Sequence, residues 1–129
     1  MASRRDQHHT HLHAVAALGK VLTRRAGSVC ELCADSLDLR PLEVPPKEEE
    51  PSIDAAILAC ARCREATESK KLPRDIDSFR FLTGSIWSEV PPVQLAAVRL
   101  LRRLVEADVS WATEVNDELW LDEETEQRV

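Results

Sequence analysis

The four cysteines of this 129-residue chain fall into two Cys-x-x-Cys pairs, Cys30 with Cys33 and Cys60 with Cys63. A gap of two residues lets both sulfurs of a pair point at one ion, and two such pairs are typical of tetrahedral zinc. Other chemistries fit less well, because disulfides need an oxidising compartment and a redox Cys-x-x-Cys needs only one pair. We therefore predict one Zn²⁺ bound by all four cysteines.

The predicted zinc site is structural. A catalytic zinc keeps one coordination position open for water, whereas four cysteine ligands close the site. Binding of a structural zinc contributes to the free energy of folding by about 10 kcal/mol or more. We therefore expect that loss of any one cysteine unfolds the region around the metal.

The sequence around each pair predicts a different local structure. The first pair follows Gly27 in a turn, and the second follows a short strand at Ile57 and Leu58 and begins a helix over 62–71. A knuckle combined with a pair at a helix start is the treble-clef arrangement. Two pairs on hairpins would instead make a zinc ribbon, and both alternatives stay open.

The segment between the two pairs is rich in proline. A strand is predicted over 39–44, and an exposed loop over 45–54, where prolines and a Lys-Glu-Glu-Glu run disfavour a helix or a central strand. Loops of this kind are usually solvated connections.

Helices are predicted on both sides of this unit. Over residues 10–27, Thr10 is placed to cap the start of a helix and Gly27 to end it. A second helix begins at Pro91, because the first helical turn does not need the N–H groups that proline lacks. Its apolar residues recur at intervals of three and four up to Val105, which indicates a wide apolar face.

A last helix is predicted from Ser110, with Glu and Asp on its outer side. The three tryptophans, Trp87, Trp111 and Trp120, are expected in the core where the helices cross. Together these elements predict a mostly helical α+β protein in one domain, 1–129. Its cysteine unit (28–73) packs against an N-terminal helix (10–27) and a C-terminal helical hairpin within residues 74–129.

The formal net charge of −6 argues against a protein that coats nucleic acid by bulk attraction. The charge is polarised, since residues 1–25 contain five basic residues and one acid, and residues 106–129 contain nine acids and one arginine. No apolar run approaches the ~20 residues that span a bilayer, and the N-terminus has no long apolar stretch typical of a secretory signal. A cytoplasmic protein without a membrane association is expected.

Few residues remain for catalysis. The chain has only three glycines, so it lacks a glycine-rich phosphate loop, and all four histidines lie in the N-terminal segment, far along the chain from the cysteines. His9 and His13, four residues apart on the predicted helix, could share a second metal, although a solvated end is the commoner situation. Candidate partner-binding residues are Glu89, Arg99, Arg102 and Arg103.

The order of these motifs resembles the N-terminal region of the bacterial PhnA family, named for an association with alkylphosphonate utilisation. The resemblance is carried by "AGSVCELCADSLDLRPLEVPP", "ILACARCR", "SIWSEVPPVQLAAVRLLRRL" and "SWATEVNDELWLDEET", which run from about Leu22 to Thr125. It implies that Cys30, Cys33, Cys60 and Cys63 are zinc ligands. Family members often carry His-Trp and another Cys where this chain has residues 78–82, "SFRFL".

Three functions follow as hypotheses. The leading one is a non-enzymatic, zinc-stabilised module that binds another macromolecule, with protein as the favoured partner. The alternative is nucleic-acid binding through arginines, namely Arg24, Arg25, Arg62, Arg64, Arg99, Arg102 and Arg103. The third is a phosphonate-related hydrolase, which would need open metal positions ringed by His and Asp that the sequence does not offer.

Overall fold

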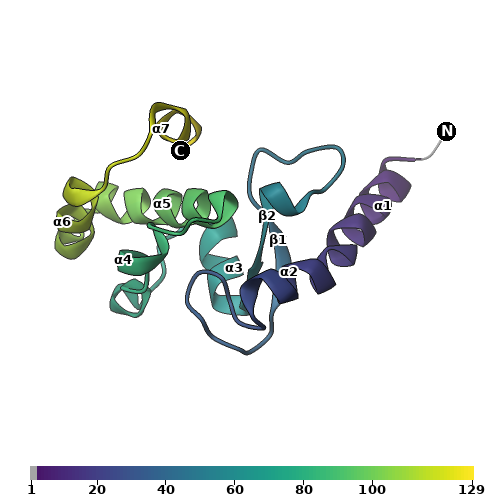
Figure 1. Cartoon of the computed structure of the whole chain (residues 1–129), viewed down its shortest axis with the longest axis horizontal. Coiled ribbons are helices and arrows are strands. Elements are labelled where there is room, and N and C mark those ends of the chain that lie inside the picture. The colour runs from purple at the N-terminus through teal and green to yellow at the C-terminus, as the bar shows by residue number, and fades with distance from the viewer. Residues whose placement is uncertain (1–2) are drawn as a thin grey trace.

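A computed structural model describes residues 3–129, with a small sheet in the middle and helices on both sides of it (Figure 1). The sheet has two antiparallel strands, β1 (Arg40–Glu43) and β2 (Ala56–Ala59). Arg40 lies opposite Ala59, and Glu43 lies opposite Ala56. The predicted strands are therefore present, and the proline-rich segment between them is the long connection of a hairpin.

Two helices stand where one was predicted at the N-terminus. α1 (Arg4–Ala17) begins well before Thr10 and is capped by the Ser3 side chain, which accepts a hydrogen bond from the Asp6 backbone N–H. α2 (Gly19–Ala26) follows after a break at Leu18 and ends, as predicted, at Gly27, whose φ is 68°. Because glycine alone adopts this left-handed conformation without strain, Gly27 fixes the direction in which the chain leaves the helix.

α1 lies at one end of the molecule and buries none of its residues (Figure 1). Its main polar attachment is His11, whose Nε2 atom lies 2.8 and 2.9 Å from the two carboxylate oxygens of Glu43 on β1. α2, in contrast, packs its buried Leu22 against Ala56 and Leu58 of β2. The α1 segment is thus tied to the body by a polar contact, and α2 by apolar packing.

The other half of the molecule is built around α5 (Pro91–Glu106). Its start at two prolines and its apolar face agree with the prediction, since Val93, Leu101 and most of the other predicted face residues are buried. α6 (Ser110–Glu118) follows after a short connection and packs against α5 near its C-terminal end (Figure 1). A separate short helix, α7 (Glu123–Arg128), follows and was not predicted.

Short elements complete the fold. α3 (Ala61–Glu68) follows β2 directly, and the chain then passes through two short helical segments, η2 (Ile76–Phe79) and α4 (Leu82–Ser85), before α5. One more short segment, η1 (Ile53–Ala55), precedes β2. One continuous apolar cluster joins the cysteines to α5 and α6.

The tryptophan prediction is wrong for two of the three residues. Trp87 is 49% exposed and Trp120 is 77% exposed, while Trp111 is partly buried against the core. Ile86, beside Trp87 in the chain, takes the buried position instead. The general preference of tryptophan for burial does not decide which neighbour on a short helical segment faces the core.

Candidate metal centre

Cys30 and Cys33 lie on a tight turn between α2 and β1. The backbone N–H of Cys30 donates to the carbonyl of Asp35 at 2.7 Å, and the N–H of Ala34 donates to the carbonyl of Cys30 at 2.9 Å. Ala34 has a φ of 67°, an uncommon conformation for a residue with a side chain, so the turn is held by these hydrogen bonds against local backbone strain. The result is that both sulfurs face the same side.

Cys60 and Cys63 lie at the start of α3. Cys60 immediately precedes the helix with extended backbone, and Cys63 is in its first turn. The position of the second pair at a helix start was predicted from the sequence. Because β2 ends at Ala59 and is fully buried, the strand delivers Cys60 into the interior next to the turn that carries the first pair.

The four sulfurs form one cluster in which all of them lie within 4.8 Å of one another. The Sγ atoms of Cys33 and Cys60 are 3.6 Å apart. Sulfurs around a tetrahedral zinc, with Zn–S bonds of about 2.3 Å, are separated by about 3.8 Å. None of the four cysteines forms a disulfide, and three of them are buried. The cluster could therefore hold a metal ion.

The sulfurs influence one another's protonation. A hydrogen bond from the Cys63 thiol lowers the pKa of Cys30 to about 4, with help from the backbone N–H groups of Cys33, Cys60 and Leu32. The same hydrogen bond, together with burial, raises the pKa of Cys63. Burial raises the pKa of Cys33. The surroundings of Cys30 thus favour its thiolate form, whereas binding of a metal cation would displace the protons of Cys33 and Cys63.

Arg62 supplies positive charge next to the cluster. Burial by itself would lower the pKa of Arg62, but its hydrogen bond to Cys33 and the charges of the nearby sulfurs raise it overall. Its guanidinium also lies 5.2 Å from the ring centroid of Phe79 and 5.5 Å from that of Phe81. Arg64, the other flanking arginine, instead binds the backbone carbonyls of Asp38 and Ala59.

A polar network that sequence reasoning missed anchors the first cysteine pair. Glu31, between the two cysteines, accepts two hydrogen bonds from the Arg25 guanidinium of α2 and one from the backbone N–H of Leu58 on β2. Arg25 also donates to the backbone carbonyls of Ile53 and Ala56. The Glu31 side chain is only 6% exposed. The one sequence signal was an acidic residue inside an otherwise apolar turn.

The predicted partner-binding arginines lie on α5, and each one bonds within the chain. Arg99 donates to the backbone carbonyls of Pro45 and Arg128. Arg102 binds the Glu126 carboxylate of α7, and Arg103 donates to the carbonyls of Ala66 and Lys71. Glu89, the fourth residue of this set, is exposed in the turn that precedes α5.

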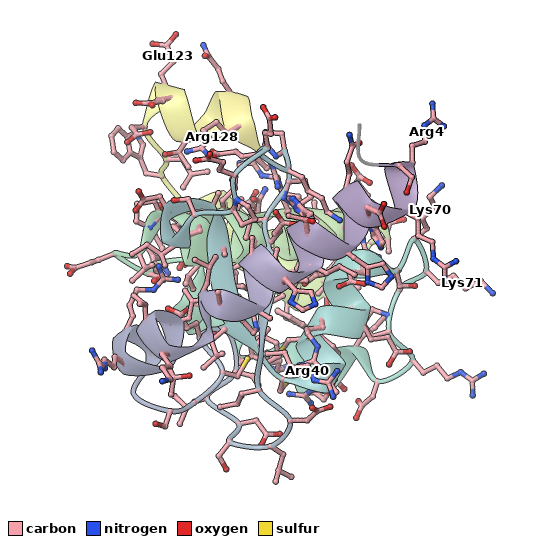
Figure 2. The ribbon with its side chains drawn as sticks, turned by 90° about the vertical axis from the view of Figure 1, so that its right-hand side faces the viewer. Arg4, Arg40, Lys70, Lys71, Glu123 and Arg128 are labelled. Carbon is pink, nitrogen blue, oxygen red and sulfur yellow. The ribbon has the colours of Figure 1, made fainter. Side chains whose placement is uncertain are left out.

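The histidines and the outward-facing charges are dispersed. His9 and His13 are exposed on α1, and within residues 3–129 neither belongs to a group of three or more possible metal ligands. Arg4, Lys70 and Lys71 extend from one edge of the molecule in Figure 2, whereas Glu123 lies at the upper corner away from them. The basic start and the acidic end of the chain therefore do not neutralise each other within the fold.

No known protein family, curated protein or solved structure matches the chain. The resemblance to PhnA therefore stays a prediction. Across residues 3–129, no helix has both the length and the apolar character needed to cross a membrane.

Proposed function

We propose that this chain is a zinc-stabilised, non-enzymatic module that binds another protein. The observation that carries the proposal is the cluster of four cysteine sulfurs, all within 4.8 Å of one another. No His or carboxylate ligand belongs to this cluster, so a zinc bound there has no position for water or substrate. The metal is then structural, and the surface of the protein binds the partner.

The order of elements around the cysteines supports a treble-clef type of site. A turn with Cys30 and Cys33 is followed by the β1–β2 hairpin and then by α3, which begins between Cys60 and Cys63. The same order agrees with a relationship to PhnA in which these cysteines are the zinc ligands. We do not propose hydrolase activity, because the cluster leaves no open coordination position.

The surface around Glu89 supports binding to a protein rather than to nucleic acid. Glu89 and the half-exposed Trp87 are separated by one residue, in the turn before α5. Tryptophan is enriched among the residues that dominate binding energy at protein interfaces, and charged residues lie at their rims. The arginines suggested for nucleic acid are mostly engaged with the chain's own carbonyl and carboxylate groups, namely Arg25, Arg64, Arg99, Arg102 and Arg103.

Native mass spectrometry of the protein purified from cell extract tests both parts of the proposal. We expect one zinc per chain and a co-purifying protein. The partner should be lost from Glu89→Lys combined with Trp87→Ala, and kept in the matched control Glu106→Lys, which reverses an exposed charge at the far end of α5. A folded protein without metal, or a partner that binds both variants equally well, would contradict the proposal.

A further inference from the structure

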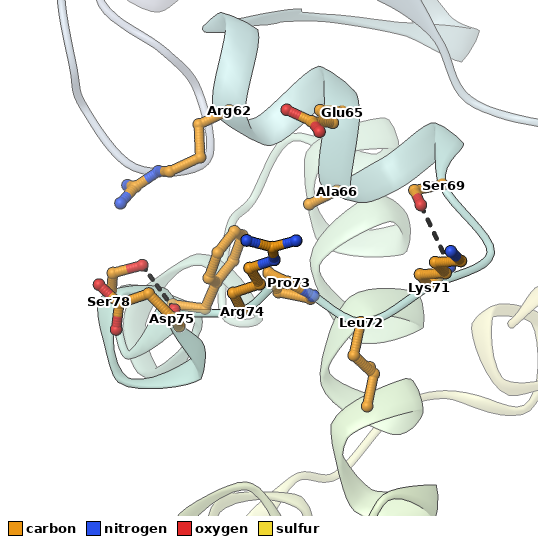
Figure 3. Close-up of a pocket in the computed structure, with 11 residues that line it drawn as sticks. Arg62, Glu65, Ala66, Ser69, Lys71, Leu72, Pro73, Arg74, Asp75 and Ser78 are labelled. Carbon is orange, nitrogen blue, oxygen red and sulfur yellow. Dashed lines mark hydrogen bonds between the residues drawn. The ribbon is translucent and has the colours of Figure 1, made fainter.

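A pocket of about 460 Å³ lies beside the cysteine cluster, between α3 and the segment that leads into η2 (Figure 3). Its apolar lining includes Ala66, Leu72, Pro73 and Phe79. Leu72 is 36% exposed, whereas Phe79 is buried and also carries the Arg62 guanidinium over its ring. The pocket thus offers an apolar surface large enough for one bulky side chain.

Three basic side chains line the same pocket: Arg62, Lys71 and Arg74. Figure 3 shows Arg62 on α3 and Arg74 on the opposite side, with both guanidinium groups next to the open space. Arg62 already faces the cysteine sulfurs, whereas Lys71 and Arg74 take part in no ion pair within residues 3–129. Two acids, Glu65 and Asp75, also line the pocket, so Lys71 and Arg74 are the cations that remain for a docked carboxylate.

The shape of the pocket is held by hydrogen bonds to the backbone of its walls. Arg103 of α5 donates to the backbone carbonyls of Ala66 at 2.7 Å and Lys71 at 3.1 Å. The hydroxyl of Ser78 donates to the carbonyl of Asp75 at 2.7 Å, which fixes the opposite wall. A pocket whose walls are fixed before binding loses little conformational entropy when it is filled.

A complementary feature lies at the other end of the chain. Between α6 and α7 the backbone is extended, so successive side chains point to opposite sides: Leu119 and Leu121 pack against the core, and Trp120 between them is 77% exposed. The acidic tail segment, residues 117–124, contains five acids and no basic residue. Trp120 is thus an exposed aromatic group surrounded by negative charge.

We propose that the acidic tail segment of one copy of this chain docks into the α3 pocket of a second copy. Trp120 lies on the apolar lining next to Phe79, and the flanking carboxylates pair with Lys71 and Arg74. The occupant is inferred from charge complementarity, because the pocket has unpaired cations over an apolar floor and the segment has unpaired carboxylates beside an exposed indole. The inference is independent of the protein partner proposed above.

The pocket and the tail segment are different surfaces, so the contact is head-to-tail. Each dimer therefore retains one free pocket and one free tail segment. Contacts of this type extend into chains unless the geometry closes a ring. The single side chain and its flanking charges bury little area, and interfaces well below about 1,000 Å² are weak and transient. We therefore expect association that rises with protein concentration and weakens as salt screens the ion pairs.

Sedimentation velocity of the full chain over a concentration series tests the proposal. Wild type should form dimers and longer species. Trp120→Ala, and separately the double variant Lys71→Glu/Arg74→Glu, should weaken association by about tenfold or more. Trp87→Ala, which removes another exposed tryptophan, should leave the association unchanged. All of the substituted side chains are exposed, and circular dichroism and metal content verify that each variant is folded.

Mixing the two defective variants gives the decisive measurement. The Trp120→Ala variant still has an intact pocket, and the Lys71→Glu/Arg74→Glu variant still has an intact acidic tail segment. The mixture should therefore form a 1:1 dimer through this one pair of surfaces. The dimer should not grow further, because its other pocket and its other tail segment are both defective. A wild type that stays monomeric at all concentrations would overturn the inference, and so would self-association unaffected by both variants. A symmetric interface would give no dimer specific to the mixture and would also overturn it. A partner protein found by native mass spectrometry would support the proposed function whichever result is obtained.

Discussion

The cysteine unit and the helical region bury their residues in different ways. In the helical region, α5 alone buries nine residues, most of them Leu, Val and Ala, and packs against α6 and α4. The cysteine unit has a sheet of only two four-residue strands, and its interior consists of β2, three cysteines and a few further side chains. A two-stranded hairpin of this kind is marginal in water by itself. The difference indicates that apolar packing stabilises the helical region, whereas the cysteine unit depends more on hydrogen bonds and on the metal that we propose.

The two regions nevertheless share a boundary. α5 contacts both β2 and α3, and the buried Cys60 and Cys63 belong to the same apolar cluster as Leu101. The cysteine unit is therefore supported on one side by α5. The predictions below test how far each region depends on its own kind of stabilisation.

The largest effect is expected for Cys63→Ser. This change removes a ligand from the cluster, and the binding energy of a structural zinc, about 10 kcal/mol or more, is comparable with the whole stability of a domain. We expect loss of the metal and of the ordered structure around it, as measured by metal analysis and by amide hydrogen exchange of β1 and β2. Retention of both would show that packing alone stabilises the cysteine unit.

Leu101→Ala should produce the next largest effect. Leu101 is fully buried on α5, and truncation of such a leucine costs about 2–5 kcal/mol. Thermal unfolding should begin at a lower temperature while the folded protein still binds its metal. The matched control is Leu72→Ala, because Leu72 is 36% exposed. An equal loss of stability in both variants would contradict the assignment of the core to α5.

Glu31→Gln should have an intermediate effect, centred on the cysteine unit. The variant keeps the shape of the side chain but weakens the bidentate contact with Arg25, and a lost buried charge-assisted hydrogen bond costs about 1–3 kcal/mol. Metal affinity should fall, as measured by competition with a chelator. Glu48→Gln, in the exposed proline-rich loop, is the control and should behave like wild type.

The smallest effect concerns the attachment of α7. Arg102 lowers the pKa of Glu126, so this carboxylate contributes stability above the pKa that it has in the unfolded chain. The contribution disappears as the pH falls through the lowered pKa. Because Glu126 is exposed, we expect α7 to detach on acidification without global unfolding, as seen by NMR of its amides. Glu126→Gln should show the detached state already at neutral pH, and an attached α7 in that variant would refute the role of this pair.

The sequence predicted the features that depend on local chemistry. The spacing of the cysteines predicted their common cluster, and Pro91 predicted the start of α5 because the missing N–H is tolerated only there. Gly27 predicted the end of the N-terminal helix because its position requires a positive φ. In each case the residue type is compatible with only a few local structures, so its position in the sequence predicts the structure there.

Features that depend on tertiary contacts could not be predicted in the same way. Gly19 is the only local signal for the break after Leu18, and a single glycine is tolerated inside a helical pattern. The start of α1 was missed because the histidine-rich segment before Thr10 has no apolar periodicity. Trp87 and Trp120 are exposed because their neighbours in the chain, Ile86 in one case and Leu119 and Leu121 in the other, pack into or against the core. Glu31 binds Arg25 and Leu58, and the second of these lies far along the sequence, so its role became visible only in the folded chain.

The short helix α3 has charged groups at both of its ends. Its first turn carries Cys63 and follows Cys60, and in its last turn the carbonyl of Ala66 accepts a hydrogen bond from Arg103. The peptide dipoles of a helix sum to partial positive charge at the first turn and partial negative charge at the last. Sulfurs made anionic by a bound metal at one end and a guanidinium at the other would therefore stabilise the same dipole. A metal bound by the cysteines would thus be coupled to α5 through the dipole of α3, without direct contact between the cysteines and Arg103.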